Sequence, residues 1–209
     1  MAYSYYLNYE KVATEIIEQQ LECLTDNNVV HDEKYDFDVI DEKSFYKNLK
    51  AGSIALMFIN ILFETTLNTI LRRKNLLEEN KDKSVDKKLE TIGEVYKLDL
   101  KAIKSGDQYC VYQNARKIRD DITHFKWNEL GASFLIHSHI RLNLGKKREY
   151  LADIFTKKYI QKSYRGVLDL IELICSQCGL AVNKEVQIID CDGRTGAYEY
   201  IKSIDTLSD

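Results

Sequence analysis

Residues 53–74 read SIALMFINILFETTLNTILRRK, and this stretch decides the fold class. Apolar side chains cover almost every face of a helix drawn through it, whereas a helix on the surface of a bundle keeps one polar face. We therefore predict a helix at the centre of a bundle, ending at the cations of residues 72–74, which suit a helix C-terminus. Its longest apolar run, residues 54–63, is too short to cross a bilayer, so we expect no association with a membrane.

Helical periodicity predicts about five helices in all. Zero prolines in 209 residues favour long uninterrupted helices, because proline is the commonest helix breaker. Residues 26–44 are polar, acidic and irregular, and we expect them to form a loop. Besides 53–74, the predicted helices cover residues 4–24, 85–96, about 107–129 and about 150–178, the last ending near Gly179.

Two segments indicate β-structure beside these helices. Residues 134–144 alternate between two faces and predict a strand, followed by a turn at 145–147. His137 and His139 share one face of that strand and are interpreted as solvent-facing, with an RNA-binding surface or a metal left as alternatives. Residues 186–190 and 197–201 predict a small C-terminal hairpin. The fold class is therefore mainly α: a bundle with a short strand or hairpin after the fourth helix.

Length and composition favour one domain over residues 1–209, with a core at 4–178 and a C-terminal extension at 180–209. The N-terminus lacks a basic stretch followed by an apolar one, so we expect a cytoplasmic protein. Five cysteines, an odd number, suit free thiols in a reducing compartment. Cys175 and Cys178 form a lone CxxC inside a helical pattern and are interpreted as two small apolar residues.

Charge is unevenly distributed along the chain. Residues 101–165 hold 14 Lys and Arg against 6 Asp and Glu, a balance of +8. The remaining residues hold 16 against 27, a balance of −11, which together give the net charge of −3. The basic segment can attract a polyanion, although an ordinary solvated face would show the same excess.

The segment Arg119-Asp120-Asp121-Ile122-Thr123-His124 lies late in the fourth predicted helix. At 100° per residue, Arg119 and His124 flank a polar stripe opposite the apolar face, and Asp120 and His124 form an i, i+4 pair. An imidazole can take the proton from a ribose 2′-hydroxyl, and a guanidinium can hold a phosphate through two hydrogen bonds. These residue types suit cleavage of RNA without a metal ion.

One chain supplies a single imidazole at this position, so an acid and a base together need two chains. Trp127 lies on the same polar stripe and can serve an interface between chains or stack on a base. We therefore expect a homodimer that acts on RNA.

The Arg119-Asp120-…-His124 pattern resembles the motif of the HEPN superfamily, an Arg followed four to six residues later by His, with a polar residue directly after the Arg. Residues 55–64 resemble the family's apolar helix, with Glu64 as its acidic residue near the site. The resemblance covers about residues 4–178. Some toxin members carry a modified Tyr two residues after the His, where this chain has Lys126.

The resemblance implies a helical-bundle homodimer whose two motifs line one cleft, and a metal-independent endoribonuclease of toxin–antitoxin, CRISPR-linked or abortive-infection systems. We expect no cofactor or metal, with an antitoxin or defence protein as partner. His124 is then the general base or acid, Arg119 binds phosphate, and Asp120 and Glu64 orient the groups. Arg116, Lys126 and Trp127 are candidates for RNA binding. We expect Arg119 to be the cationic partner that Glu64 needs.

Two alternatives remain open from the sequence. A catalytically silent helical module that binds RNA or a protein would have the same helices, with the Arg–His spacing a coincidence. A structural dimerisation domain would show no salt-sensitive RNA binding.

Overall fold

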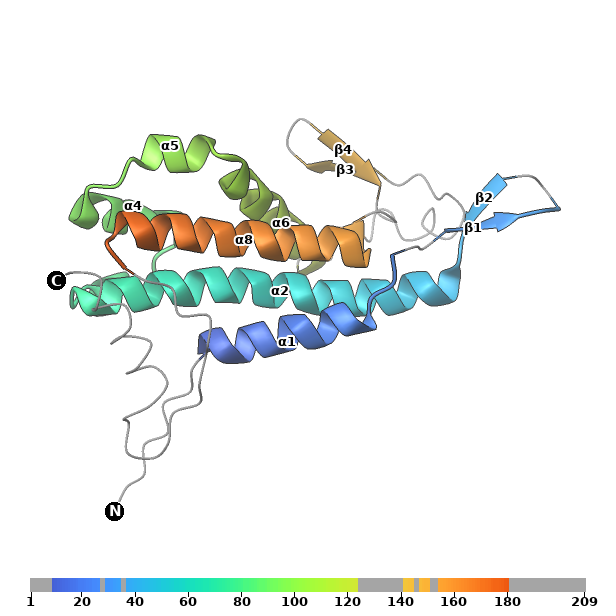
Figure 1. The fold of residues 1–209 in the computed structure, drawn as a ribbon, viewed down its shortest axis with the longest axis horizontal. Coiled ribbons are helices and arrows are strands. Elements are labelled where there is room, and N and C mark those ends of the chain that lie inside the picture. The colour runs from blue at the N-terminus through green and yellow to red at the C-terminus, as the bar shows by residue number, and fades with distance from the viewer. Residues whose placement is uncertain are drawn as a thin grey trace, which may run out of the picture. The chain divides into compact units, whose positions relative to one another are not determined.

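The computed structural model describes residues 9–26, 29–34, 37–123, 141–144, 147–150 and 154–180. This part of the chain is mainly helical, as predicted (Figure 1). The predicted C-terminal hairpin and residues 134–140 of the predicted strand lie outside it. The elements in order are α1 (Tyr9–Cys23), β1 (Val29–Asp32), β2 (Phe37–Ile40), α2 (Glu42–Arg73), α3 (Leu77–Asn80), α4 (Val85–Tyr96), α5 (Leu100–Ser105), α6 (Asp107–Thr123), β3 (Arg141–Leu144), β4 (Lys147–Tyr150) and α8 (Lys157–Gln177).

The chain divides into two compact units. Of the described residues, unit 1 holds 9–15, 61–110 and 166–180, and unit 2 holds those within 16–60 and 111–165. Helices α1, α2, α6 and α8 each contribute residues to both units. The single-domain organisation therefore stays a prediction.

Helix α2 is 32 residues long and begins eleven positions before the Ser53 start that the sequence suggested. Ser44 donates a hydrogen bond to the carboxylate of Asp41, and the Phe45 N–H donates to the Asp41 carbonyl over 2.8 Å. The second is the first i to i−4 backbone bond of α2, which places Asp41 at the N-cap position. Phe45 and Asn48 are both buried, so the first turns carry a core face that the polar composition of residues 42–52 concealed.

The loop predicted at residues 26–44 is wrong in part, because β1 and β2 form an antiparallel hairpin there. Val29 pairs with Ile40, and Val30 pairs with Val39. β-Branched side chains favour extended backbone, and the paired ones at Val29–Val30 and Val39–Ile40 outweigh the acidic residues that suggested a loop.

Polar side chains buried in α2 bond to the helix itself. The Asn60 amide donates to the Leu56 carbonyl over 2.8 Å, and the Thr66 hydroxyl donates to the Leu62 carbonyl over 2.9 Å. By length and composition α2 could cross a membrane, and 56% of its most apolar window is buried inside the fold. A core helix of a soluble protein has the same properties, so the absence of membrane association stays a prediction.

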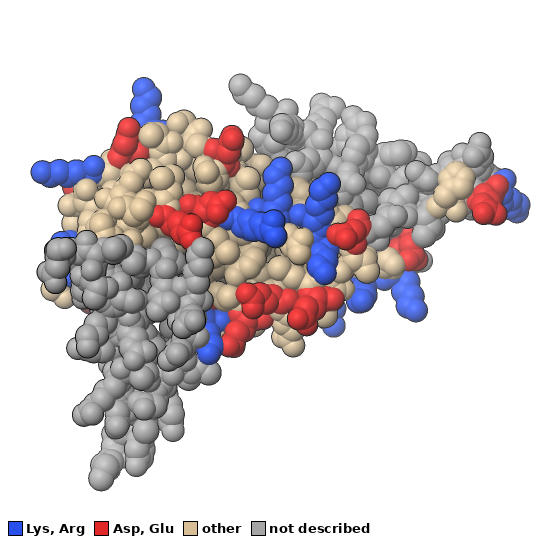
Figure 2. Space-filling view, viewed as in Figure 1, with Lys and Arg blue, Asp and Glu red and all other residues tan. Residues whose placement is uncertain are grey.

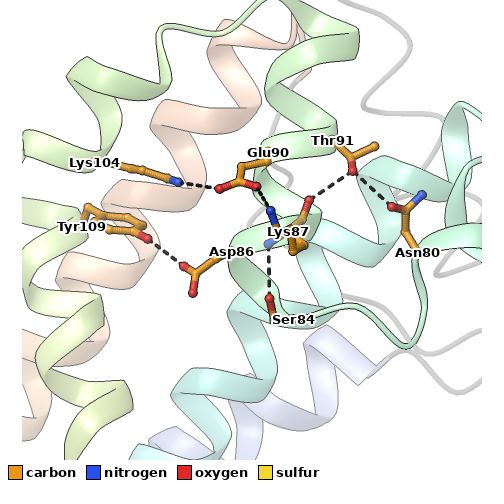
Figure 3. Close-up of polar contacts among 8 residues, drawn as sticks. All are labelled: Asn80, Ser84, Asp86, Lys87, Glu90, Thr91, Lys104 and Tyr109. Atoms are coloured by element: carbon orange, nitrogen blue, oxygen red, sulfur yellow. Dashed lines mark hydrogen bonds and ion pairs between the residues drawn. The ribbon is translucent and has the colours of Figure 1, made fainter.

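In unit 1, polar contacts join α4 to α3, α5 and α6 (Figure 3). The Ser84 hydroxyl caps α4 by accepting from the Lys87 N–H. The Thr91 hydroxyl donates to Asn80 in α3, and the Tyr109 hydroxyl in α6 donates to Asp86 over 2.9 Å. Helix α4 matches the helix predicted at 85–96, whereas the short α3 and α5 were not predicted.

The same network contains a carboxylate between two lysines. Lys87 and Lys104 approach Glu90 at 2.9 and 3.3 Å. Hydrogen bonds from Lys87 first, and then from Lys104, hold the pKa of Glu90 below its ordinary value. Because Glu90 is exposed, its pairs position α5 beside α4 and contribute little to the free energy of unfolding.

In unit 2, the buried Asn48 of α2 holds the chain that leaves α1. Its side chain accepts from the Thr25 N–H over 3.0 Å and donates to the Thr25 hydroxyl over 2.8 Å. The Thr25 carbonyl in turn accepts from the Lys157 N–H at the start of α8, over 3.0 Å. Gly52 allows the close approach of Phe155, two residues before α8, because a Cβ there would lie 2.8 Å from its ring. The Asn48 amide and the Thr25 carbonyl therefore link α2, the chain after α1 and the start of α8.

Helix α8 begins at Lys157, not near residue 150 as predicted, because residues 147–150 form β4, antiparallel to β3. The Thr156 hydroxyl accepts from the Tyr159 N–H and caps the helix start. The predicted end near Gly179 is confirmed: its φ is +68°, and Leu180 N donates to the Cys175 carbonyl over 2.8 Å. This is the bonding of a Schellman motif.

The two cysteines of the CxxC lie at this end of α8. Cys175 is 1% exposed and Cys178 is half-buried, as the helical pattern indicated. Burial, and then the neighbouring Cys178, raise the pKa of Cys175 to about 12, and burial raises the pKa of Cys178 to about 12. Both are therefore neutral thiols at pH 8 and poor nucleophiles.

We expect iodoacetamide at pH 8 to alkylate the exposed Cys23 and Cys110 in the folded protein and to leave Cys175 and Cys178 unmodified until denaturant is added. Peptide mass spectrometry measures each site separately. Alkylation of Cys175 and Cys178 at the rate of Cys23 would contradict the buried, protonated state.

Candidate active site

Helix α6 carries the candidate site on its last two turns. Tyr112, Ala115 and Ile118 are at most 1% exposed and recur at intervals of three, so they form one core face. At 100° per residue Arg119 falls between Tyr112 and Ala115, on this core face and not at the edge that the helical wheel of the sequence suggested. Its side chain is nevertheless 33% exposed.

The guanidinium of Arg119 has one charged neighbour in the described part of the chain. Its Nε lies 3.3 Å from Oδ1 of Asp120, whose side chain is 38% exposed. The same Nε is buried and has no hydrogen-bond partner there. The contact with Asp120 is therefore an attraction between charges without a well-directed hydrogen bond. The terminal nitrogens of Arg119 also make no hydrogen bond to any described residue.

A buried N–H without an acceptor costs about 1–3 kcal/mol, because it has lost its hydrogen bonds to water. An anion from solvent cannot reach the buried Nε, but it can reach the terminal nitrogens, because the Arg119 side chain is 33% exposed. Asp120 partly neutralises the cation and limits how strongly it attracts an anion. The terminal nitrogens are therefore the part of Arg119 that an anion could bind.

Only some of the other residues of the predicted site belong to the described part of the chain. Arg116 is half-buried, one turn before Arg119 on α6, and has a partner of its own. His124, Lys126 and Trp127 lie outside the described residues. The described part of α6 ends at Thr123, whose hydroxyl donates to the Asp120 carbonyl over 3.1 Å. The structure therefore brings together Arg119 and Asp120, and the pairing of Asp120 with His124 stays a prediction.

Glu64 has a cationic partner, as its place in an apolar helix required, but the cation is Lys88. The Lys88 ammonium donates to Oε1 of Glu64 over 2.7 Å within unit 1. Lys88 is 1% exposed, whereas the Glu64 side chain is 44% exposed. The expectation that Arg119 would neutralise Glu64 is thus replaced by a structural pair between α2 and α4.

The sequence did carry a signal for this pair. Lys88 falls between Val85, Leu89 and Ile92 on the apolar face of α4, where a lysine is out of place without a carboxylate. An isolated acid in one apolar helix and an isolated base in another together indicate a buried ion pair.

The described residues contain no group of three or more His, Cys, Asp or Glu arranged to hold a metal ion. Comparison of the chain with protein-family models, with curated proteins and with solved structures finds no match. The candidate site therefore rests on the residues and their geometry.

The unequal burial of Glu64 and Lys88 predicts unequal effects of removing each. Glu64→Ala leaves a buried ammonium without a partner and should lower the free energy of unfolding by about 2 kcal/mol. Lys88→Met leaves a carboxylate that water can reach, and should change it by less than about 1 kcal/mol. Urea denaturation measures both variants.

The double variant Glu64→Ala/Lys88→Met is the control, and should unfold at the urea concentration of Lys88→Met alone, since no buried charge remains. A Glu64→Ala variant as stable as the wild type would contradict the structural role of the pair.

Proposed function

We propose that this chain is a metal-independent endoribonuclease of the HEPN type that acts as a homodimer. The observation that carries the proposal is Arg119, whose buried Nε and terminal nitrogens lack hydrogen-bond acceptors among the described residues. This cation lies five positions before His124 on the same segment. A guanidinium with unused donors beside a histidine suits a phosphodiester as substrate.

In the proposed reaction, His124 takes the proton from the 2′-hydroxyl, and the resulting 2′-oxygen attacks the adjacent phosphorus. The bond to the 5′-oxygen of the next nucleotide breaks, and this oxygen receives a proton from an acid. The products are a 2′,3′-cyclic phosphate and a 5′-hydroxyl. Arg119 holds the two non-bridging oxygens while negative charge develops on them. Asp120 orients the guanidinium it contacts and stabilises the protonated imidazole.

Two protomers complete the site in this proposal, because the base and the acid are then the His124 of each chain. Arg116, Lys126 and Trp127 hold the RNA strand beside the reacting phosphate. Glu64 has no role in the chemistry, because its carboxylate is bonded to Lys88. The setting is a cytoplasmic toxin or antiviral-defence effector, controlled by an antitoxin or another defence protein.

The test is cleavage of a mixed pool of single-stranded RNAs in EDTA. The wild type should cleave, and Arg119→Ala and His124→Ala should each lose about a hundredfold or more in rate, because each removes a group used in the transition state. Lys117→Ala is the matched control: it removes an exposed cation from the same helix and should cleave at the wild-type rate.

No cleavage by the wild type, or equal cleavage by all three variants, would contradict the proposal. RNA binding that survives in His124→Ala, with no turnover by the wild type at any pH, would instead identify a silent RNA-binding module. Cleavage that EDTA abolishes would replace the metal-free mechanism.

A further inference from the structure

A row of cations runs along the exposed face of α8 in unit 2. Lys158, Lys162 and Arg165, called the basic row below, are all exposed and stand at i, i+4 and i+7. On a helix they share one face, separated by about 6 and 4.5 Å along the axis at 1.5 Å per residue. The opposite face packs into the core through Ile160 and Val167.

The basic row forms no ion pair within the described part of the chain, although the exposed Asp169 lies on the same face one turn beyond Arg165. None of its three side chains forms an ion pair or hydrogen bond there. In unit 1 some exposed lysines are paired, Lys81 with Glu78 and both Lys87 and Lys104 with Glu90, whereas the side chains of Lys83, Lys97 and Lys101 form no ion pair with a described residue. The first turn of α8 also holds no acidic residue, although acids are favoured at a helix N-terminus.

The described acidic residues of unit 2 lie outside α8, on α1, on α6, on β4, at the start of α2 and in the segment between α1 and α2. Glu18 and Glu22 are exposed on α1, one turn apart. Figure 2 shows Lys and Arg gathered over the first half of α8, and Asp and Glu in a row along α1. Like charges a turn apart repel each other, so this separation costs stability that mixed charges would not. It produces a field that attracts a polyanion to α8 and repels it from α1.

We propose that the basic row binds the phosphate backbone of the single-stranded RNA that the candidate active site cleaves, an inference that rests on the proposed function. Single-stranded nucleic acid presents one negative charge per nucleotide, and a row with about one cation per turn can contact successive phosphates. Ammonium groups act as point charges without base preference, so the row sets affinity and the direction of the strand, not sequence specificity. Arg119 and the basic row both belong to unit 2.

The test measures binding of a short 2′-O-methyl RNA, which lacks the attacking hydroxyl and therefore stays intact, by fluorescence anisotropy over a range of salt concentrations. The variant is Lys158→Gln/Lys162→Gln/Arg165→Gln. The control is Lys81→Gln/Lys87→Gln/Lys104→Gln, with the same change of charge in unit 1. Thermal unfolding and sedimentation accompany each protein.

Each phosphate contact on a single strand contributes about 0.7 to the slope of log affinity against log salt, so loss of three contacts should reduce the slope by about 2. The control should keep the wild-type slope. An equal loss in both variants would overturn the inference, since net charge alone would explain it. An unchanged slope in the basic-row variant, or no binding by the wild type, would overturn it as well.

Two further outcomes separate this inference from the proposed function. If the wild type cleaves unmodified RNA while the basic-row variant keeps its slope, the inference fails and the nuclease stands. If the slope falls as expected but the wild type cleaves no RNA, the basic row stands and the nuclease fails. A basic-row variant that becomes monomeric and binds RNA normally would assign the row to the acidic α1 face of a second copy.

Discussion

Burial of α2 is the constraint on which the rest of the structure depends. Its core residues extend from Phe45 to Leu71, so partners must cover it in both units. Polar groups that enter with it need local acceptors, which the helix carbonyls provide for Asn60 and Thr66. Glu64 cannot be satisfied in this way and binds Lys88 across from α4. The apolar packing determines which elements meet, and the few buried polar contacts determine how they are aligned.

Sequence periodicity predicted the long helices because each has one apolar stripe, as α4 and the described part of α6 do. Periodicity failed to predict where α2 and α8 begin. Residues 42–52 look polar, but buried Phe45, Asn48 and Ala51 form a core face at intervals of three. Asn48 is buried with its amide bonded to Thr25, which lies 23 positions away in the sequence. No local sequence pattern predicts such a contact. The start of α8 was placed too early because β4 precedes it.

The candidate site, too, could be predicted from the sequence only in part. Helical geometry alone suggested that Arg119 lies beside a polar stripe, whereas the buried residues of α6 place it on the core face with its Nε buried, which depends on packing around α6. The partner of Glu64 required knowing that α2 and α4 are neighbours. The basic row could be predicted from its spacing in the sequence, but its exposure and the absence of an ion pair with another described residue could not. Helical spacing shows which residues share a face, and tertiary packing decides which of them are left with unused charge.

The proposed reaction is attack by the ribose 2′-hydroxyl without a metal ion, with Arg119 holding the phosphate. Its most direct test places a single 2′-deoxynucleotide at the cleaved position of an RNA substrate and follows the reaction in EDTA, with product ends identified by mass spectrometry. The account predicts that the modified bond is not cut and that the unmodified RNA yields a 2′,3′-cyclic phosphate and a 5′-hydroxyl. Cleavage at the deoxynucleotide, or a product carrying a 5′-phosphate, would contradict it.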